Sequence, residues 1–234
     1  MIDKMKYFYN ELLFNYPSGQ KIEKICASRM FNNVSEDNIL IGNAAELINT
    51  LKYIAGEKIG LTIPSFNEYV RCFPNSEILY INSKDDNYCL SFNRIANKLD
   101  EVDTMVIISP DNPTGSHLKY DEVIKLLDLA KQKDKQIIFD ESFIDFANNN
   151  YTLIDDDILN KYTNLIVIKS ISKSYGVPGL RLGVLASGNK DYIKIINNNL
   201  PVWNINSFAE YFLQIINIYK KDYVLGCNKI KEER

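Results

Sequence analysis

The sequence contains one histidine and four cysteines, which are too few and too scattered for a metal centre. His117 stands alone, and Cys26, Cys72, Cys89 and Cys227 lack the C-x-x-C spacing of zinc sites. We therefore expect no bound metal. The thiols are interpreted as small buried hydrophobic groups in a reduced, cytoplasmic compartment.

Long hydrophobic runs are missing as well, and so is a surplus of positive charge. No stretch approaches the roughly 20 apolar residues of a membrane-spanning helix. The first residues, MIDKMKYFYNELLFNYP, mix charges with aromatics and do not resemble a signal peptide. The formal net charge is -3 and no basic run is present, so neither a membrane nor a nucleic-acid partner is expected.

The pattern that is present is an alternation of short apolar runs with amphipathic helical segments, starting near Asn38. Strands are predicted at NILIG, KIGLTIP, SEILYI, TMVIISP, QIIFDE and LIVIKS, and helices at AAELINTLKYIA, FNEYVRCF, SFNRIANKL and YDEVIKLLDLAKQK. QIIFDE and LIVIKS are apolar throughout, which is typical of parallel strands buried on both faces. The alternation predicts an α/β three-layer sandwich with a mostly parallel central sheet.

Three segments are expected along the chain. Residues 1–33 read as an N-terminal helical segment, and residues 34–205 as the large domain. Residues 206–234 read as a C-terminal helix that leads toward a small domain missing from this sequence. The composition, with 46% hydrophobic and 24% charged residues, is that of an ordinary folded protein.

Polar residues follow several of the predicted strands at the point where each strand ends. Asp140 comes directly after QIIF, Asn112 follows TMVIISP, and Lys173 follows LIVIKS by a few residues, with Arg181 one short loop further on. The carboxyl ends of parallel strands meet at one edge, where ligands bind. An amine, a buried carboxylate, an amide and an arginine form the set that pyridoxal phosphate requires.

The motifs extend this likeness along nearly the whole chain. In order they are NYP, IGNAAELI, IPSFNEY, SPDNPTG, IIFDESFIDF, SISKSYGVPGLRLG and PVWNINSFAE. Together they resemble the large domain of fold-type I, class I/II aminotransferases that depend on pyridoxal 5'-phosphate. Histidinol-phosphate aminotransferases and threonine-phosphate decarboxylases are the most similar groups.

On the ring side of the cofactor, the resemblance implies five roles. Lys173 would form the Schiff base with the aldehyde, and Asp140 would pair with the ring nitrogen. Asn112 would bond the ring hydroxyl, and Phe66 would stack on the ring with Tyr69 nearby.

On the phosphate side, the resemblance implies an anion seat at a helix start. Its donors would be backbone groups of Ala44 and Ala45 together with the side chains of Ser170, Ser172 and Arg181. Tyr16 would reach the phosphate of a neighbouring subunit, which implies a homodimer.

The sequence departs from the family at several points. The usual GNG-A-x-E loop is GNAAE here, one residue short, so a tighter or shifted phosphate seat is expected. Phe143 replaces a tyrosine that touches the ring oxygen, which leaves Asn112 to make that contact alone. The N-P-x-G segment and the small domain with its substrate arginine are absent, so we expect a truncated member.

Each residue also has a simpler interpretation. Lys173 alone could be a solvated lysine, Asp140 a helix cap and Asn112 a turn former. Phe66 and Tyr69 could be core residues, the serines loop residues and Tyr16 a surface aromatic.

The predicted function is amino transfer from an amino acid, or a phosphorylated or phosphonate-bearing amine, to a 2-oxo acid. The alternatives are decarboxylation of an amino-acid phosphate on the same scaffold and a non-catalytic fragment that keeps the fold.

Overall fold

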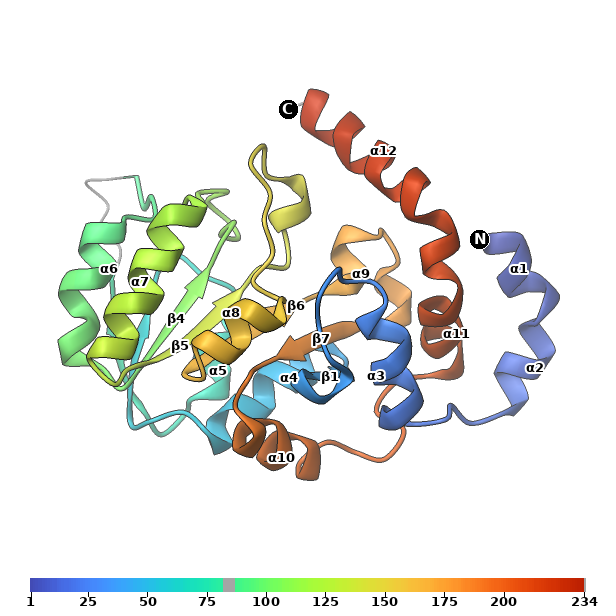
Figure 1. The fold of residues 1–234 in the computed structure, drawn as a ribbon, viewed down its shortest axis with the longest axis horizontal. Coiled ribbons are helices and arrows are strands. Elements are labelled where there is room, and N and C mark those ends of the chain that lie inside the picture. Colours follow the sequence, from blue (N-terminus) through green and yellow to red (C-terminus); the bar gives the residue numbers. More distant parts are fainter. Residues whose placement is uncertain (82–86, 234) are drawn as a thin grey trace.

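The computed structural model describes residues 1–81 and 87–233, and its centre is a seven-stranded sheet with helices on both faces (Figure 1). The strand order is β1-β7-β6-β5-β4-β2-β3. The strands are β1 (Ile39–Gly42), β2 (Lys58–Leu61), β3 (Glu77–Tyr80), β4 (Thr104–Ile108), β5 (Gln136–Asp140), β6 (Leu165–Lys169) and β7 (Gly183–Ala186). Every pairing among β2, β3, β4, β5 and β6 is parallel, and β7 pairs antiparallel with both β1 and β6.

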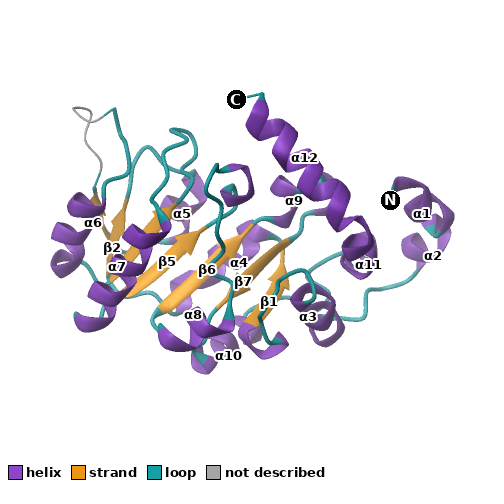
Figure 2. Cartoon of the chain, turned by 45° about the horizontal axis from the view of Figure 1, so that its top comes forward, coloured by secondary structure: helices purple, strands orange, loops and turns teal. Residues whose placement is uncertain are grey.

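Helices cover both faces of the sheet (Figure 2). They are α1 (Ile2–Tyr7), α2 (Tyr9–Phe14), α3 (Gln20–Ser28), α4 (Ala44–Thr50), α5 (Asn67–Cys72), α6 (Phe92–Lys98), α7 (Tyr120–Gln132), α8 (Asp156–Lys161), α9 (Ile171–Ser174), α10 (Lys190–Asn198), α11 (Ser207–Ile215) and α12 (Lys220–Glu232). Helices α1 and α2 stand at one side of the sheet (Figure 2). Buried residues of α4, α5 and α10 belong to one core, and those of α3, α6, α7, α8 and α11 belong to the other. The predicted three-layer α/β sandwich with a mostly parallel sheet is confirmed.

The strands contribute to both cores because successive side chains point to opposite faces of a sheet. In β5, Ile137 and Phe139 pack with one helix layer, and Ile138 packs with the other. This double burial explains why the central strands read as continuous apolar runs. The amphipathic stripe of α7, which includes Val123 and Leu126, is buried as the periodicity predicts.

Some elements differ from the sequence prediction. Strand β7 was not predicted, and the antiparallel part of the sheet was therefore missed. The predicted N-terminal helical segment starts as two short helices, α1 and α2, which are separated at Phe8, and the predicted C-terminal helix is interrupted by a 3₁₀ turn over Ile216–Tyr219. Helix α4 ends at Thr50 and continues as a 3₁₀ turn over Leu51–Tyr53.

The N-terminus lies at the side of the molecule where α1, α2 and α11 gather, whereas α6 and α7 lie at the opposite side (Figure 1). Helix α12 runs from α11 toward the top centre of the view, where the C-terminus lies. Within the described residues, no helix combines the length and the apolar character needed to span a bilayer. The boundaries proposed at residues 33 and 205 stay a prediction.

Candidate active site

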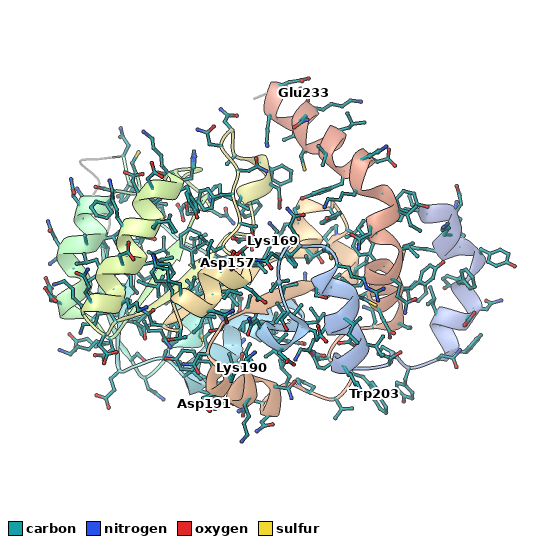
Figure 3. The ribbon with its side chains drawn as sticks, in the orientation of Figure 1. Asp157, Lys169, Lys190, Asp191, Trp203 and Glu233 are labelled. Atoms are coloured by element: carbon teal, nitrogen blue, oxygen red, sulfur yellow. The ribbon has the colours of Figure 1, made fainter. Side chains whose placement is uncertain are left out.

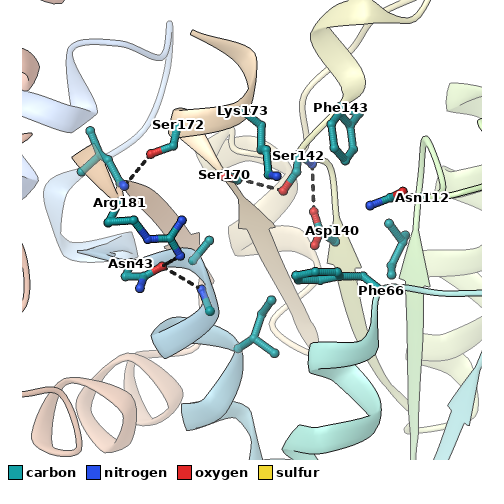
Figure 4. Close-up of a pocket in the computed structure, with 15 residues that line it drawn as sticks. Asn43, Phe66, Asn112, Asp140, Ser142, Phe143, Ser170, Ser172, Lys173 and Arg181 are labelled. Atoms are coloured by element: carbon teal, nitrogen blue, oxygen red, sulfur yellow. Dashed lines mark hydrogen bonds between the residues drawn. The ribbon is translucent and has the colours of Figure 1, made fainter. Parts of the chain in front are cut away.

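One cavity lies where β1, β4, β5 and β6 end, and it gathers most of the predicted site residues (Figure 4). The carboxyl ends of parallel strands meet at this edge of the sheet, as the position of polar groups after each strand predicts. The lining residues are Asn43, Ala44, Ala45, Ile48, Phe66, Ile108, Asn112, Asp140, Ser142, Phe143, Ser170, Ser172, Lys173, Arg181 and Leu182.

Asp140 forms the buried floor of this cavity. It is the last residue of β5 and is 4% exposed. The Tyr69 hydroxyl donates a hydrogen bond to its Oδ2 at 2.7 Å, and the Ser142 N–H donates to its Oδ1 at 2.9 Å. Burial raises the pKa of Asp140, and the hydrogen bonds from Ser142 and Tyr69 partly oppose this rise. A carboxylate in such a place calls for a cationic partner.

Lys173 and Asn112 stand at the open rim, on opposite sides of Asp140. Lys173 lies on the short helix α9 directly after β6, is exposed, and points with its amine into the cavity (Figure 4). Asn112 is exposed in the loop after β4, and Phe66, at the start of α5, is 38% exposed. An amine and a buried carboxylate therefore face the same space, with an aromatic ring beside it.

The other end of the cavity holds donors that converge on one acceptor. The Oδ1 atom of Asn43 accepts hydrogen bonds from Arg181 Nη2 at 3.0 Å and from the Ala45 N–H at 3.2 Å. Ser172 lies beside them, and its Oγ accepts from the Leu182 N–H at 2.7 Å, which leaves the hydroxyl proton available. A guanidinium, a helix-start N–H and a hydroxyl form a seat suited to an anion.

The close approach of β7 to α4 shapes this seat. A Cβ atom on Gly183 would lie 2.9 Å from Ala44 Cβ and 3.1 Å from Ala44 N. Glycine is therefore required where the strand passes the start of the helix. Arg181, two residues earlier, has a φ of 56°, in the left-handed region that few non-glycine residues adopt.

Two predicted site residues lie outside the cavity. Tyr69 is fully buried beneath Asp140 and reaches the site through that carboxylate. Tyr16 is 76% exposed and stacks on Trp203, with ring centroids 4.1 Å apart. Nine of the eleven predicted residues line the cavity: Lys173, Asp140, Asn112, Phe66, Ala44, Ala45, Ser170, Ser172 and Arg181.

Sequence reasoning missed two polar residues of the site. Asn43 caps α4, and its position after β1 within GNAAE is the signal that could have identified it. Ser142 lies two residues after Asp140, and its Oγ accepts a hydrogen bond from the Ser170 N–H at 2.9 Å. This bond joins the ends of β5 and β6, which no local pattern indicates.

Comparisons with known proteins agree with this arrangement. The sequence model of the family "Aminotransferase class I and II" matches residues 18–216. An L-serine phosphate decarboxylase of Campylobacter jejuni is 36% identical over 229 residues, which cover 93% of this chain and 57% of the relative. A histidinol-phosphate aminotransferase of Pyrococcus furiosus is 30% identical over 183 residues, covering 76% of this chain and 51% of the relative.

A solved structure shows the same fold. A decarboxylase from Sulfurospirillum multivorans superimposes with a TM-score of 0.81 at 28% identity, covering 98% of this chain and 67% of that chain. This chain thus spans about half the length of the curated relatives it matches.

Proposed function

Since the chain belongs to the class I and II aminotransferase family of fold-type I enzymes, whose cofactor is pyridoxal 5'-phosphate, we propose that Lys173 holds this cofactor beside Asp140. The observation that carries the proposal is the shared cavity of Lys173, Asp140 and Arg181. The substrate would be a small amine, and the reaction would take place at its amino-bearing carbon.

The donor set of the cavity fits this cofactor. Asp140 is a buried carboxylate with a raised pKa, which a cationic ring nitrogen would stabilise in its charged form. The donors that converge on Asn43 Oδ1 would serve a phosphate once the amide oxygen moves aside. Lys173 supplies the amine that the aldehyde requires.

Pyridoxal 5'-phosphate, when bound, supplies an aldehyde that bonds to amines and a ring that withdraws electrons from the substrate. Asp140 would hold a proton at the ring nitrogen, and Asn112 would orient the ring through its hydroxyl. The Lys173 Nζ atom, once free, would move a proton to or from the substrate carbon. Phe66 would cover one face of the ring and exclude water from it.

Amino transfer to a 2-oxo acid is the first candidate reaction, because the family model of class I and II aminotransferases spans most of the chain. Decarboxylation is the second candidate. The L-serine phosphate decarboxylase matches at 36% identity and the histidinol-phosphate aminotransferase at 30%, so decarboxylation is favoured by the more similar of the two. The names of both relatives support a phosphorylated substrate.

We further propose a cytoplasmic homodimer in which Tyr16 of one subunit approaches the phosphate seat of the other. The high exposure of Tyr16, and the fact that it does not line the cavity of its own chain, support this arrangement. A non-catalytic fragment that keeps the fold is the remaining alternative, because the chain spans only part of its relatives.

Borohydride reduction of the purified protein incubated with pyridoxal 5'-phosphate tests the proposal. We expect a pyridoxyl group on Lys173 by peptide mass spectrometry, and an absorbance band near the visible edge that Lys173→Ala abolishes. Lys133→Ala is the matched control, because Lys133 pairs with Asp100 on the surface, away from the cavity. A colourless protein with an unmodified Lys173 would contradict the proposal.

The two candidate reactions are separated by their products. Incubation with O-phosphoserine and 2-oxoglutarate should release glutamate if the protein transfers amino groups. Carbon dioxide without glutamate would instead favour decarboxylation. Cofactor binding without either product would favour the fragment interpretation.

A further inference from the structure

Behind the ends of β5 and β6 lies a buried lysine paired with two carboxylates. The Lys169 Nζ atom is 2.8 Å from Asp145 Oδ2 and 3.6 Å from Glu141 Oε1. The side chain of Lys169 is 6% exposed, and that of Glu141 is not exposed at all. Figure 3 shows Lys169 near the middle of the molecule, whereas Trp203 and Glu233 lie at its periphery. We call these three residues the Lys169 cluster.

The Lys169 cluster adjoins the candidate site in sequence but lies outside the cavity. Glu141 stands between Asp140 and Ser142, and Lys169 directly precedes Ser170. Asp140, Ser142 and Ser170 line the cavity, whereas the three residues of the cluster do not. The cluster and the cavity therefore lie at the same two strand ends. They lie on opposite faces of the sheet because successive residues of a strand point to opposite faces.

Glu141 also ties a third segment to these strand ends. Its carboxylate accepts hydrogen bonds from Thr152 Oγ1 at 2.6 Å and from the Leu153 N–H at 2.8 Å. Its own N–H donates to the carbonyl of Ile168 in β6 at 2.9 Å. The cluster therefore joins β5, β6 and the loop before α8 at one point.

On the cavity side, a chain of hydrogen bonds continues from the same backbone. The Ser170 N–H donates to Ser142 Oγ at 2.9 Å, and the Ser142 N–H donates to Asp140 Oδ1 at 2.9 Å (Figure 4). The orientation of the Asp140 carboxylate thus depends on where β6 lies relative to β5. The ion pair between Lys169 and Glu141 links the same two strand ends.

Stability alone does not account for such a cluster. Burial lowers the pKa of Lys169, but attraction from Glu141 and Asp145 outweighs it, so the pKa is raised and the lysine is charged. Buried ion pairs can often be replaced by apolar side chains with no loss of stability, because desolvation offsets the attraction. They are better suited to holding one geometry.

We propose that Lys169 is a positioning residue, which holds Asp140 and Ser170 in the geometry of the cofactor site through its ion pairs with Glu141 and Asp145. This inference rests on the proposed function for its role, because Asp140 is the group that meets the cofactor ring. The ion pairs fix the ends of β5 and β6 on the side away from the cavity. The hydrogen bonds through Ser142 then fix the Asp140 carboxylate relative to these strand ends.

The test compares variants of the Lys169 cluster with a variant at the opposite end of β5. Glu141→Gln keeps the shape of the side chain and one of its two acceptor oxygens but removes its charge. Lys169→Met removes the cation, whereas Lys169→Arg keeps a cation at this position. Gln136→Leu is the matched control, because Gln136 begins β5 and its Oε1 accepts a buried hydrogen bond from Thr104 Oγ1 at 2.8 Å, far from the cavity.

Three quantities are measured for each variant: the dissociation constant for pyridoxal 5'-phosphate, amide hydrogen exchange at Ser142 and Ser170, and the urea midpoint. We expect Glu141→Gln and Lys169→Met to weaken cofactor binding about tenfold and to speed exchange at both amides. Lys169→Arg should show the cofactor affinity and the amide exchange of the wild type. Gln136→Leu should lower the urea midpoint while leaving the cofactor affinity and the two amides unchanged.

Cofactor affinity and amide exchange within twofold of wild type in Glu141→Gln would overturn the inference. It would also be overturned if Gln136→Leu weakened cofactor binding equally at an equal loss of stability. If Lys169→Met does not fold, Glu141→Gln and Lys169→Arg decide the question. A wild-type protein that does not bind the cofactor would contradict the proposed function alone, because amide exchange at Ser142 and Ser170 would still report on positioning.

Discussion

The carboxylate of Asp140 is held from both sides by hydrogen bonds that leave its cavity face open. The Tyr69 hydroxyl donates from below, and the Ser142 N–H donates from the loop after β5. Burial also raises the pKa of the Tyr69 hydroxyl, so it remains a donor at neutral pH. Two fixed donors leave the carboxylate one orientation, which is the preorganisation that a cofactor site requires.

Tyr69→Phe should weaken cofactor binding without changing the fold. Loss of a hydrogen bond to a charged group should reduce the free energy of unfolding by about 1–3 kcal/mol. The pKa of Asp140, already raised by burial, should rise further when this donor is lost. Cofactor affinity should therefore fall most at acidic pH, where the protonated carboxyl no longer attracts the ring nitrogen. A titration with pyridoxal 5'-phosphate across the pH range measures this.

Tyr162→Phe is the control for that prediction. Tyr162 is 1% exposed, and its hydroxyl donates to Asp128 Oδ1 at 2.7 Å, in a part of the molecule away from the cavity. It should lower stability and leave the pH dependence of cofactor binding as in wild type. Equal pH profiles for Tyr69→Phe and wild type would show that Tyr69 is a core residue only.

At the scale of elements, α3 packs against α11, and each of these helices carries one buried acidic side chain. Glu23 on α3 is not exposed, and within residues 1–81 and 87–233 neither of its carboxyl oxygens has a hydrogen-bond partner. Glu210 on α11 accepts hydrogen bonds from the Ser18 N–H at 2.6 Å and the Ser18 hydroxyl at 2.7 Å. Burial, followed by repulsion from Glu210, raises the pKa of Glu23 from 4.5 to about 7.

Glu23→Gln should remove a pH dependence of stability. Because the folded-state pKa is raised, the stability of the wild type falls as pH rises from 4.5 to about 7 and stays lower above that range. Relative to wild type, the variant should gain on the order of 3 kcal/mol of unfolding free energy between about pH 4.5 and about pH 8. Urea unfolding of both proteins at the two pH values measures this difference.

The exposed Glu11→Gln on α2 serves as the control, and its difference from wild type should not change with pH. A constant difference between Glu23→Gln and wild type would show that Glu23 is not the titrating group.

At the scale of the whole molecule, Tyr16 lies on an exposed aromatic surface and does not line the cavity. Tyr16 stacks on Trp203, and both rings are at least half exposed, with Phe14 80% and Val202 79% exposed close by in the sequence. Exposed aromatic groups of this kind are typical of interaction surfaces. The proposed homodimer would place this surface against a second copy.

A mixed dimer tests whether Tyr16 acts across the interface. In a dimer of one Tyr16→Phe and one Lys173→Ala subunit, the Lys173 site faces the intact Tyr16 of its partner. We expect that site to bind the cofactor with wild-type affinity, whereas the Tyr16→Phe homodimer should bind about fivefold more weakly for loss of one hydrogen bond.

Absorbance titration of dimers separated by two affinity tags measures this effect. Weak binding in the mixed dimer would place the action of Tyr16 within its own chain. A monomer in sedimentation would contradict the proposed assembly.

The sequence by itself determined the six strands predicted from apolar runs, the fold class and the residues at the strand ends. The pattern of apolar residues is a local property, so QIIFDE predicts both a buried strand and the polar Asp140 at its end. The motif around Lys173 and Arg181 likewise marks a ligand edge without any knowledge of the fold. These residues do lie around one cavity.

Only the tertiary structure decided which segments meet. Strand β7 lies antiparallel between β1 and β6, which brings the start of α4 beside Arg181 and assembles the anion seat. Tyr69 lies under Asp140, 71 residues away in the chain, and Lys169 pairs with Asp145 behind the cavity. Such partners are chosen by packing and desolvation over long sequence separations, and no local pattern carries that information.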